Sequence, residues 1–234
     1  MLMEEQINGT RCFFYGMPGA KDLLIQAVDE HDLEGLEQEI DCIRGSTGRP
    51  FLLAAFLADS WTDDLSPWPA PPVFGKAGFG GQAAGTLAFI LDTLLPRLKE
   101  KFDPAALYLG GYSLSGLFAL WAACQTDAFR GIAACSPSVW FPGWDTYSQA
   151  HPVRSPWVYL SLGDREEKTR NTVMARVGDC LRQQYARLQA QPGRGECALE
   201  WNPGNHFMDA PQRTARGFAW LLDRAYAVQE GRDN

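Results

Sequence analysis

Short apolar runs alternate with longer amphipathic segments along most of the chain. The short runs are bounded by Gly, Pro or Asp, and their length and composition are typical of buried β-strands. They lie at Arg11–Tyr15, Leu23–Val28, Pro50–Leu57, Ala105–Gly110, Gly131–Cys135, Trp157–Leu162 and Cys197–Trp201. The pattern therefore predicts a sheet of about seven strands.

The segments between these runs repeat apolar residues at the spacing of an α-helix. Helices are expected at Asp32–Arg44, Gln82–Leu95, Leu117–Ala123, Thr172–Gln191 and Gln212–Tyr226. We expect the second of these to stop before Pro96, because proline interrupts a helix. Parallel strands need crossover connections, so the alternation predicts an α/β fold with a mostly parallel central sheet and helices on both faces. The first strand is expected to be antiparallel at the sheet edge.

Length and composition bound the organisation of the chain. Its 234 residues are 46% hydrophobic, which suffices for one sizeable core. An α/β chain of this length usually forms a single domain, so we expect one domain over residues 1–234. Residues 227–234 are expected to form a disordered tail.

The segment Gly111–Gly116, with the sequence Gly-Tyr-Ser-Leu-Ser-Gly, joins a predicted strand to a predicted helix. Strand, tight turn and helix are the context that a nucleophile elbow requires, with small residues two positions before and after the serine. Gly111 and Ser115 fill those positions around Ser113. If Ser115 were the nucleophile, the second small position would fall on Leu117, which is too large. Ser113 is therefore the candidate nucleophile, and the alternative is a plain turn.

A serine nucleophile needs a base and an acid that orients the base. We expect both to follow the serine, in the order Ser, acid, His. His31 precedes Ser113, and His151 precedes the strand that should deliver the acid. His206, in a loop between the last predicted strand and the last helix, is therefore the candidate base.

The candidate acid follows the strand Trp157–Leu162. Glu166 stands at the spacing Gly-x-x-acid from Gly163, and Asp164 and Glu167 compete with it. The alternative is that this charged run is only the solvated start of a helix. Glu166 is the preferred acid.

A tetrahedral intermediate needs backbone N–H donors for its oxyanion. One is expected from Leu114, directly after the serine. The second should come from the loop after Leu23–Val28, where Glu30 and His31 are the alternatives.

With these residues assigned, the chain resembles the esterase family of α/β-hydrolases that includes siderophore esterases, feruloyl esterases and mycolyltransferases. The resemblance covers roughly residues 22–224 and is carried by Ile25–Asp29, Asp64–Pro67, Ser136–Trp140 and Gly163–Glu166. The family's glycine after the first of these segments is replaced by Glu30. The resemblance implies an α/β-hydrolase fold and a serine esterase or acyltransferase that needs no cofactor, and it favours Glu166 over its neighbours.

Aromatic residues gather in the two loops that should flank Ser113. Trp61, Trp140 and Trp144, together with Asp64, are the candidate lining of a substrate pocket. Such a rim suits an apolar or aromatic part of an ester. The alternative is that the rings pack the loops onto the sheet or cover a homodimer face.

Charge and composition exclude other classes. A net charge of −7 without a cluster of Lys or Arg argues against a nucleic-acid partner. No apolar run approaches the roughly 20 residues of a membrane span, and no secretion signal is evident, so a cytoplasmic location is expected. The six cysteines lack metal-binding or redox spacing and are expected to be reduced, and no metal site is expected.

The sequence therefore predicts a carboxylic ester hydrolase that forms an acyl-enzyme on Ser113 and acts on a small-molecule ester. An acyltransferase with the same residues is one alternative. A non-catalytic binding module on the same fold is the other.

Overall fold

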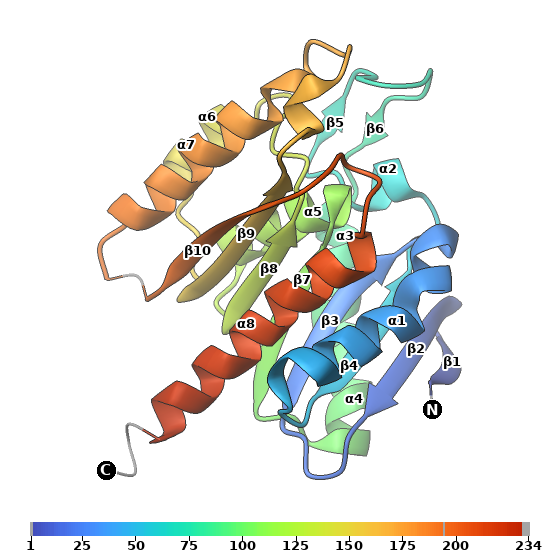
Figure 1. Ribbon diagram of the computed structural model, residues 1–234. Helices are drawn as coiled ribbons and strands as arrows, with labels where there is room; N and C mark the ends of the chain where they lie inside the picture. The colour runs from blue at the N-terminus through green and yellow to red at the C-terminus, as the bar shows by residue number, and fades with distance from the viewer. Residues whose placement is uncertain (1, 194, 231–234) are drawn as a thin grey trace.

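The computed structural model describes residues 2–193 and 195–230, which contain an eight-stranded sheet in the order β1-β2-β4-β3-β7-β8-β9-β10 (Figure 1). The strands are β1 (Met3–Ile7), β2 (Thr10–Gly16), β3 (Asp22–Val28), β4 (Leu52–Leu57), β7 (Ala106–Tyr112), β8 (Gly131–Cys135), β9 (Trp157–Gly163) and β10 (Cys197–Asn202). A separate short pair, β5 (Pro69–Ala70) and β6 (Phe79–Gly80), lies in a loop. From β4 to β10 all neighbours are parallel. The predicted α/β fold class with a mostly parallel central sheet is confirmed.

The strand that the sequence placed at the edge is β2, and it is antiparallel to both of its neighbours. The edge position was wrong, because β1 pairs outside it. The β1 segment alternates partly buried and exposed residues and is too polar to resemble a buried strand. An edge strand with one solvated face needs little apolar character.

Two helices cover one face of the sheet, α1 (Glu30–Thr47) and α8 (Ala210–Glu230), and they pack against each other (Figure 1). Apolar side chains of both helices meet strand residues of the same face, such as Leu24 and Tyr108. The opposite face packs against α3 (Ala83–Ala88), η1 (Phe89–Leu94), α4 (Leu95–Phe102), α5 (Ser113–Gln125) and α7 (Val177–Ala190). Short helical segments lie in the loops at α2 (Trp61–Asp64), α6 (Trp144–Ala150), η2 (Glu166–Lys168) and η3 (Met174–Arg176). Helices therefore cover both faces, as the alternation predicts.

The helix that was expected to stop before Pro96 continues through it to Phe102. The preceding segment η1 is a π-helical turn, in which Leu95 N–H donates to the carbonyl of Ile90, five residues earlier. A π-turn changes the hydrogen-bond register and accommodates a residue that has no N–H. Leu94, Leu95 and Leu98 stay buried across the junction, so packing on the sheet maintains the helix.

The end of the chain differs from its expected tail. Helix α8 runs to Glu230, so residues 227–230 are helical, and residues 231–234 lie outside the described residues. The assignment of the whole chain to one domain stays a prediction.

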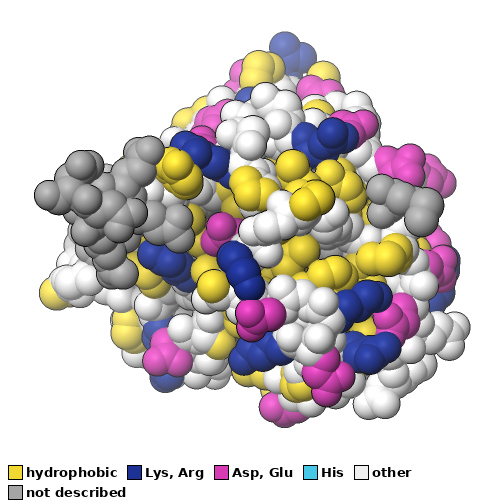
Figure 2. All heavy atoms as spheres, turned by 90° about the horizontal axis from the view of Figure 1, so that it is seen from below, with side chains coloured by type: hydrophobic (Ala, Val, Ile, Leu, Met, Phe, Trp, Pro, Cys, Tyr) yellow, Lys and Arg dark blue, Asp and Glu magenta, His cyan; other side chains and the backbone are white. Residues whose placement is uncertain are grey.

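On the face seen from below in Figure 2, Lys and Arg are interspersed with Asp and Glu and form no continuous basic surface.

A buried carboxyl lies between α1 and β3. Glu39 is 7% exposed and accepts a hydrogen bond from Gln26 Nε2 at 2.9 Å. Burial is the main cause that raises the pKa of Glu39 from 4.5 to about 8, and the nearby Asp32 adds to it. The neutral acid is therefore the form that suits the fold near neutral pH.

This environment predicts a pH-dependent loss of stability that Glu39→Gln removes. A pKa raised on folding contributes stability that is fully present below about pH 4.5 and is lost as the pH rises through about 8. The Gln side chain keeps the acceptor for Gln26 without the charge. At pH 8.5 the variant is expected to be more stable than the wild type by a few kcal/mol, since each pKa unit corresponds to about 1.36 kcal/mol.

Thermal melts between pH 5 and pH 9 test this expectation. The exposed Glu37 on the same helix provides the control, and Glu37→Gln is expected to follow the wild-type profile. A Glu39→Gln profile parallel to that of the wild type would contradict the assignment.

Candidate functional site

Ser113 lies at the tip of a strained turn between β7 and α5. Its φ of 56° falls in the left-handed region, and Gly111 two residues earlier has a φ of 157°. A Cβ on Gly111 would collide with the Ser115 side chain. The elbow therefore needs glycine at that position, and the strand and helix approach each other as the sequence pattern predicts.

The two serines of this segment occupy different environments. Ser113 Oγ lies 3.0 Å from His206 Nε2, within hydrogen-bond distance. Ser115 is fully buried and donates its hydroxyl proton to the carbonyl of Ala27 at 3.0 Å. Ser113, and not Ser115, therefore faces the candidate base.

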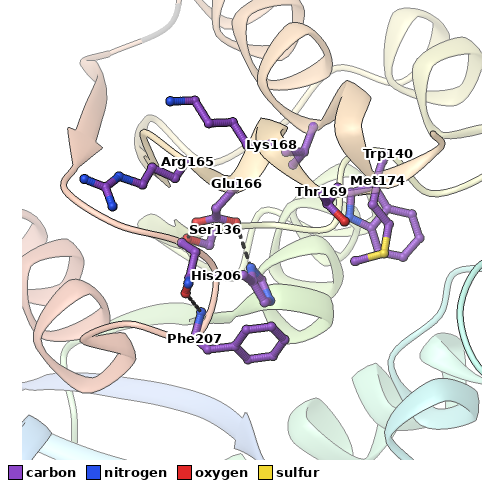
Figure 3. A pocket seen from close by; sticks show the side chains of 11 residues that line it. Ser136, Trp140, Arg165, Glu166, Lys168, Thr169, Met174, His206 and Phe207 are labelled. Carbon is purple, nitrogen blue, oxygen red and sulfur yellow. Dashed lines mark hydrogen bonds and ion pairs between the residues drawn. The ribbon is translucent and has the colours of Figure 1, made fainter. Parts of the chain in front are cut away.

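His206 connects Ser113 to a carboxylate. Its Nδ1 lies 2.7 Å from Glu166 Oε2 (Figure 3), while its other ring nitrogen, Nε2, faces Ser113. Ser113, Glu166 and His206 follow β7, β9 and β10, whose carboxyl ends meet at one edge of the sheet. The topology thus brings together three residues that are far apart in the sequence, at the edge where open α/β sheets bind ligands.

The other oxygen of Glu166 is held by three donors. Oε1 accepts hydrogen bonds from Ser136 Oγ at 2.6 Å, from Gly163 N–H at 2.7 Å and from Arg213 Nη1 at 3.1 Å. Burial by itself raises the pKa of Glu166. The hydrogen bond and charge of His206, with the bonds from Ser136 and Gly163, outweigh it, so that the net pKa is lowered. Glu166 is ionised and its orientation is set.

The two competing acids serve other contacts. Asp164 Oδ1 accepts from the Gly204 N–H at 2.8 Å and shapes the loop that carries His206. Glu167 forms an ion pair with Arg182. Of the three acids, Glu166 contacts His206.

The predicted oxyanion donors lie at the starts of two helices. Leu114 is in the first turn of α5, directly after Ser113. Glu30 and His31 open α1 behind a capping box in which Asp29 and Asp32 bond each other's backbone N–H. Among the described residues, the box leaves the N–H groups of Glu30 and His31 without a partner, as the start of a helix does. The oxyanion role of these donors stays a prediction.

The side chains of Glu30 and His31 contact charged residues nearby. Glu30 forms an ion pair with Arg11, and His31 Nδ1 lies 3.7 Å from Glu34 Oε2. His31 also lines a separate cavity of about 290 Å³ beside α1 and α8, together with Tyr112.

A cavity of about 180 Å³ opens beside His206, and both polar and apolar side chains line it (Figure 3). Trp140, Met174, Val177 and Phe207 form the apolar part. Trp140 is the one predicted pocket residue among them. Met174 and Phe207 were not predicted from the sequence. Phe207 directly follows His206 in the chain, which is the signal that could have identified it, and its side chain is 90% exposed.

The other predicted pocket residues lie elsewhere. Trp144 is fully buried and donates its indole N–H to Gln184 Oε1 at 3.1 Å. Asp64 accepts from Ser60 N–H at 2.8 Å, and Trp61 begins α2 and packs against the core. The two rings thus pack their loops onto the core, and Asp64 bonds within its own loop.

Two further observations concern metal binding and membrane spans. No group of three or more His, Cys, Asp or Glu among the described residues is arranged to hold a metal ion. In the same part of the chain no helix is both long and apolar enough to cross a membrane. The cytoplasmic location and the homodimer stay predictions.

Comparison with known proteins assigns the sequence to a family. Residues 64–197 match the family model described as "Putative esterase". No curated protein matches the chain.

Several solved structures share the fold. An IroE-like serine hydrolase from Shewanella oneidensis superposes with a TM-score of 0.81 at 16% identity, covering 95% of this chain and 80% of the other. The siderophore hydrolase EstA from Aspergillus nidulans superposes with a TM-score of 0.70 at 19% identity, covering 95% and 93%.

The enterobactin esterase FES from Shigella flexneri gives a TM-score of 0.70 at 17% identity, covering 97% of this chain and 60% of the other. At these identities the likeness shows the fold alone. The family model spans more than half of the sequence, and the chain therefore belongs to this esterase family and is a carboxylic ester hydrolase.

Proposed function

We propose that the chain hydrolyses its ester through an acyl-enzyme on Ser113, with His206 as base and acid and Glu166 as the residue that orients His206. The observation that carries this proposal is the position of His206 between the other two, 3.0 Å from Ser113 Oγ and 2.7 Å from Glu166 Oε2. Each distance is short enough for the proton transfer or the hydrogen bond that its role requires.

The reaction has two steps. Ser113 Oγ attacks the ester carbonyl carbon as His206 Nε2 takes its proton, and His206 then gives that proton to the departing alcohol. A water molecule next attacks the acyl-enzyme, losing a proton to His206, which returns it to Ser113. The ionised Glu166 accepts the Nδ1–H of His206 throughout and stabilises the imidazolium formed in each step.

Backbone donors at two helix starts are suited to the oxyanion of both tetrahedral intermediates. Leu114 N–H lies in the first turn of α5. The N–H of Glu30 or of His31, each without a partner among the described residues, is the second donor. Developing negative charge at the start of a helix is favoured by the helix dipole.

The cavity beside His206 supports an ester with an apolar or aromatic group. Trp140 and Phe207 supply ring surfaces, and Met174 supplies an adaptable thioether wall. The shared fold with proteins described as siderophore hydrolases and as an enterobactin esterase makes a siderophore ester one candidate substrate. Transfer of the acyl group to an acceptor other than water is the alternative outcome, which product analysis with a candidate acceptor distinguishes.

A fluorophosphonate probe tests the nucleophile directly. The wild type is expected to carry one adduct, on the peptide that contains Ser113, because the hydroxyl beside His206 is the activated one. The adduct should be absent in Ser113→Ala and present in Ser115→Ala, as intact mass and peptide mapping would measure. Labelling that survives Ser113→Ala refutes the assignment.

A further inference from the structure

One buried cation lies behind the candidate triad. Arg213 is in the first turn of α8, and its side chain is fully buried. Its Nη1 donates to Glu166 Oε1 at 3.1 Å and to the Tyr112 hydroxyl at 2.9 Å, and its Nη2 donates to the carbonyl of Pro203 at 2.9 Å. A single side chain thus reaches three separate segments of the chain.

Each of these segments carries one residue of the proposed triad. Tyr112 directly precedes Ser113, and Pro203 lies three positions before His206 in the same loop. Tyr112 also donates its hydroxyl proton to the carbonyl of His206 at 2.9 Å. Arg213 and Tyr112 therefore connect the segments that carry Ser113, Glu166 and His206 through hydrogen bonds on the side of α8.

The charges around Arg213 are few. Among the described residues, the ionisable groups that face it are Glu166, Tyr112 and Cys135. The Cys135 thiol contacts the Arg213 carbonyl, and His206 binds the other oxygen of Glu166. Burial raises the pKa of Tyr112 and raises that of Cys135 to about 12, so both stay protonated near neutral pH. Arg213 and Glu166 are therefore the charged pair, and a buried guanidinium persists only with such a partner.

We propose that Arg213 is a positioning residue for ester hydrolysis, which holds the loops of Ser113, Glu166 and His206 in register. This inference rests on the proposed function. The guanidinium offers a planar fork of donors, so one rigid group satisfies three acceptors at once, which a lysine ammonium on a flexible stem does less well. With Ser136 and Gly163, Arg213 occupies Glu166 Oε1 and leaves Oε2 to His206.

Substitution of Arg213 tests this role on a p-nitrophenyl ester. Arg213→Met is expected to lower kcat about 100-fold with little change in KM, since a small misplacement of catalytic groups costs about that much. Arg213→Lys keeps the charge and a donor for Glu166, so it should recover part of kcat.

Controls separate this role from a general effect on folding. Arg216 lies one turn later on α8 and pairs with the surface Glu200, so Arg216→Met should keep wild-type kinetics. If Arg213→Met does not fold, Tyr112→Phe decides the question. It removes one linking hydroxyl and is expected to lower kcat about tenfold without an equal rise in KM.

Two results would overturn the inference. One is a folded Arg213→Met with wild-type kcat, and the other, where that variant is unfolded, is a Tyr112→Phe with wild-type kcat. A wild type without Ser113-dependent turnover is a different failure, because it refutes the proposed function itself. Measuring Ser113→Ala in parallel distinguishes the two.

Discussion

Ser113→Ala is expected to abolish nearly all turnover of a p-nitrophenyl ester, lowering kcat by about 10⁴- to 10⁶-fold. Without the hydroxyl no acyl-enzyme forms, and only substrate binding and the oxyanion donors still act on the reaction. KM should change little, because the lost interaction belongs to the chemical step. Steady-state kinetics across a range of ester concentrations measure both quantities.

Ser115→Ala is the matched control for this substitution. It removes a hydroxyl two residues away that bonds the carbonyl of Ala27, so it should cost about 1 kcal/mol of stability and leave kcat within a few-fold of the wild type. The double variant Ser113→Ala/His206→Ala should be no slower than Ser113→Ala, since residues that act as a unit are not additive. A second large loss in the double variant would contradict the proposed pairing.

Glu166→Gln is expected to have the second largest effect, lowering kcat by about 10³- to 10⁴-fold. The amide cannot stabilise the imidazolium of His206 and can present a donor where Nδ1–H needs an acceptor. The substitution also leaves the buried Arg213 charge without its partner, which should reduce the free energy of unfolding by about 3–5 kcal/mol. Kinetics at a temperature well below the melting point separate the two effects.

The control is Glu167→Gln, which replaces the neighbouring acid. Glu167 pairs with Arg182 at the surface, where an ion pair contributes little, so activity and stability should stay close to the wild type. The two substitutions also resolve which acid serves His206. A Glu167→Gln defect as large as that of Glu166→Gln would contradict the assignment.

The pH dependence of Glu166 has a defined sign. Its pKa is lowered in the fold, so its contribution to stability is present above the ordinary value of 4.5 and is lost as the pH falls through the lowered pKa. The Glu166→Gln variant should not show this loss of stability at acid pH.

The local sequence pattern was sufficient to predict the main strands and the tight turn at Ser113. Short apolar runs between glycines, prolines and aspartates are typical of strands in a covered sheet, so their positions followed from length, composition and spacing. Strand β1 was missed because an edge strand exposes one face and carries charge. The helix through Pro96 was missed because packing of Leu94, Leu95 and Leu98 outweighs a local signal.

The pocket shows the limit of reasoning from residue types. Trp140 and Trp144 are four residues apart in one aromatic loop, yet the first lines the cavity beside His206 and the second is buried against Gln184. The composition of this segment shows that aromatic rings are present, but the backbone path of the loop determines the direction in which each ring points. Phe207 could have been considered from its adjacency to His206.

The sequence by itself determined the main strands of the sheet, the turn at Ser113 and the order in which an acid and a histidine follow it, because these depend on spacing along the chain. The tertiary structure alone decided that Glu166, rather than Asp164 or Glu167, contacts His206. It alone revealed Arg213, which comes from a helix about 50 residues beyond Glu166 and meets it only because α8 packs across the carboxyl ends of the strands. Contacts between distant segments depend on how the layers pack, and no local pattern encodes them.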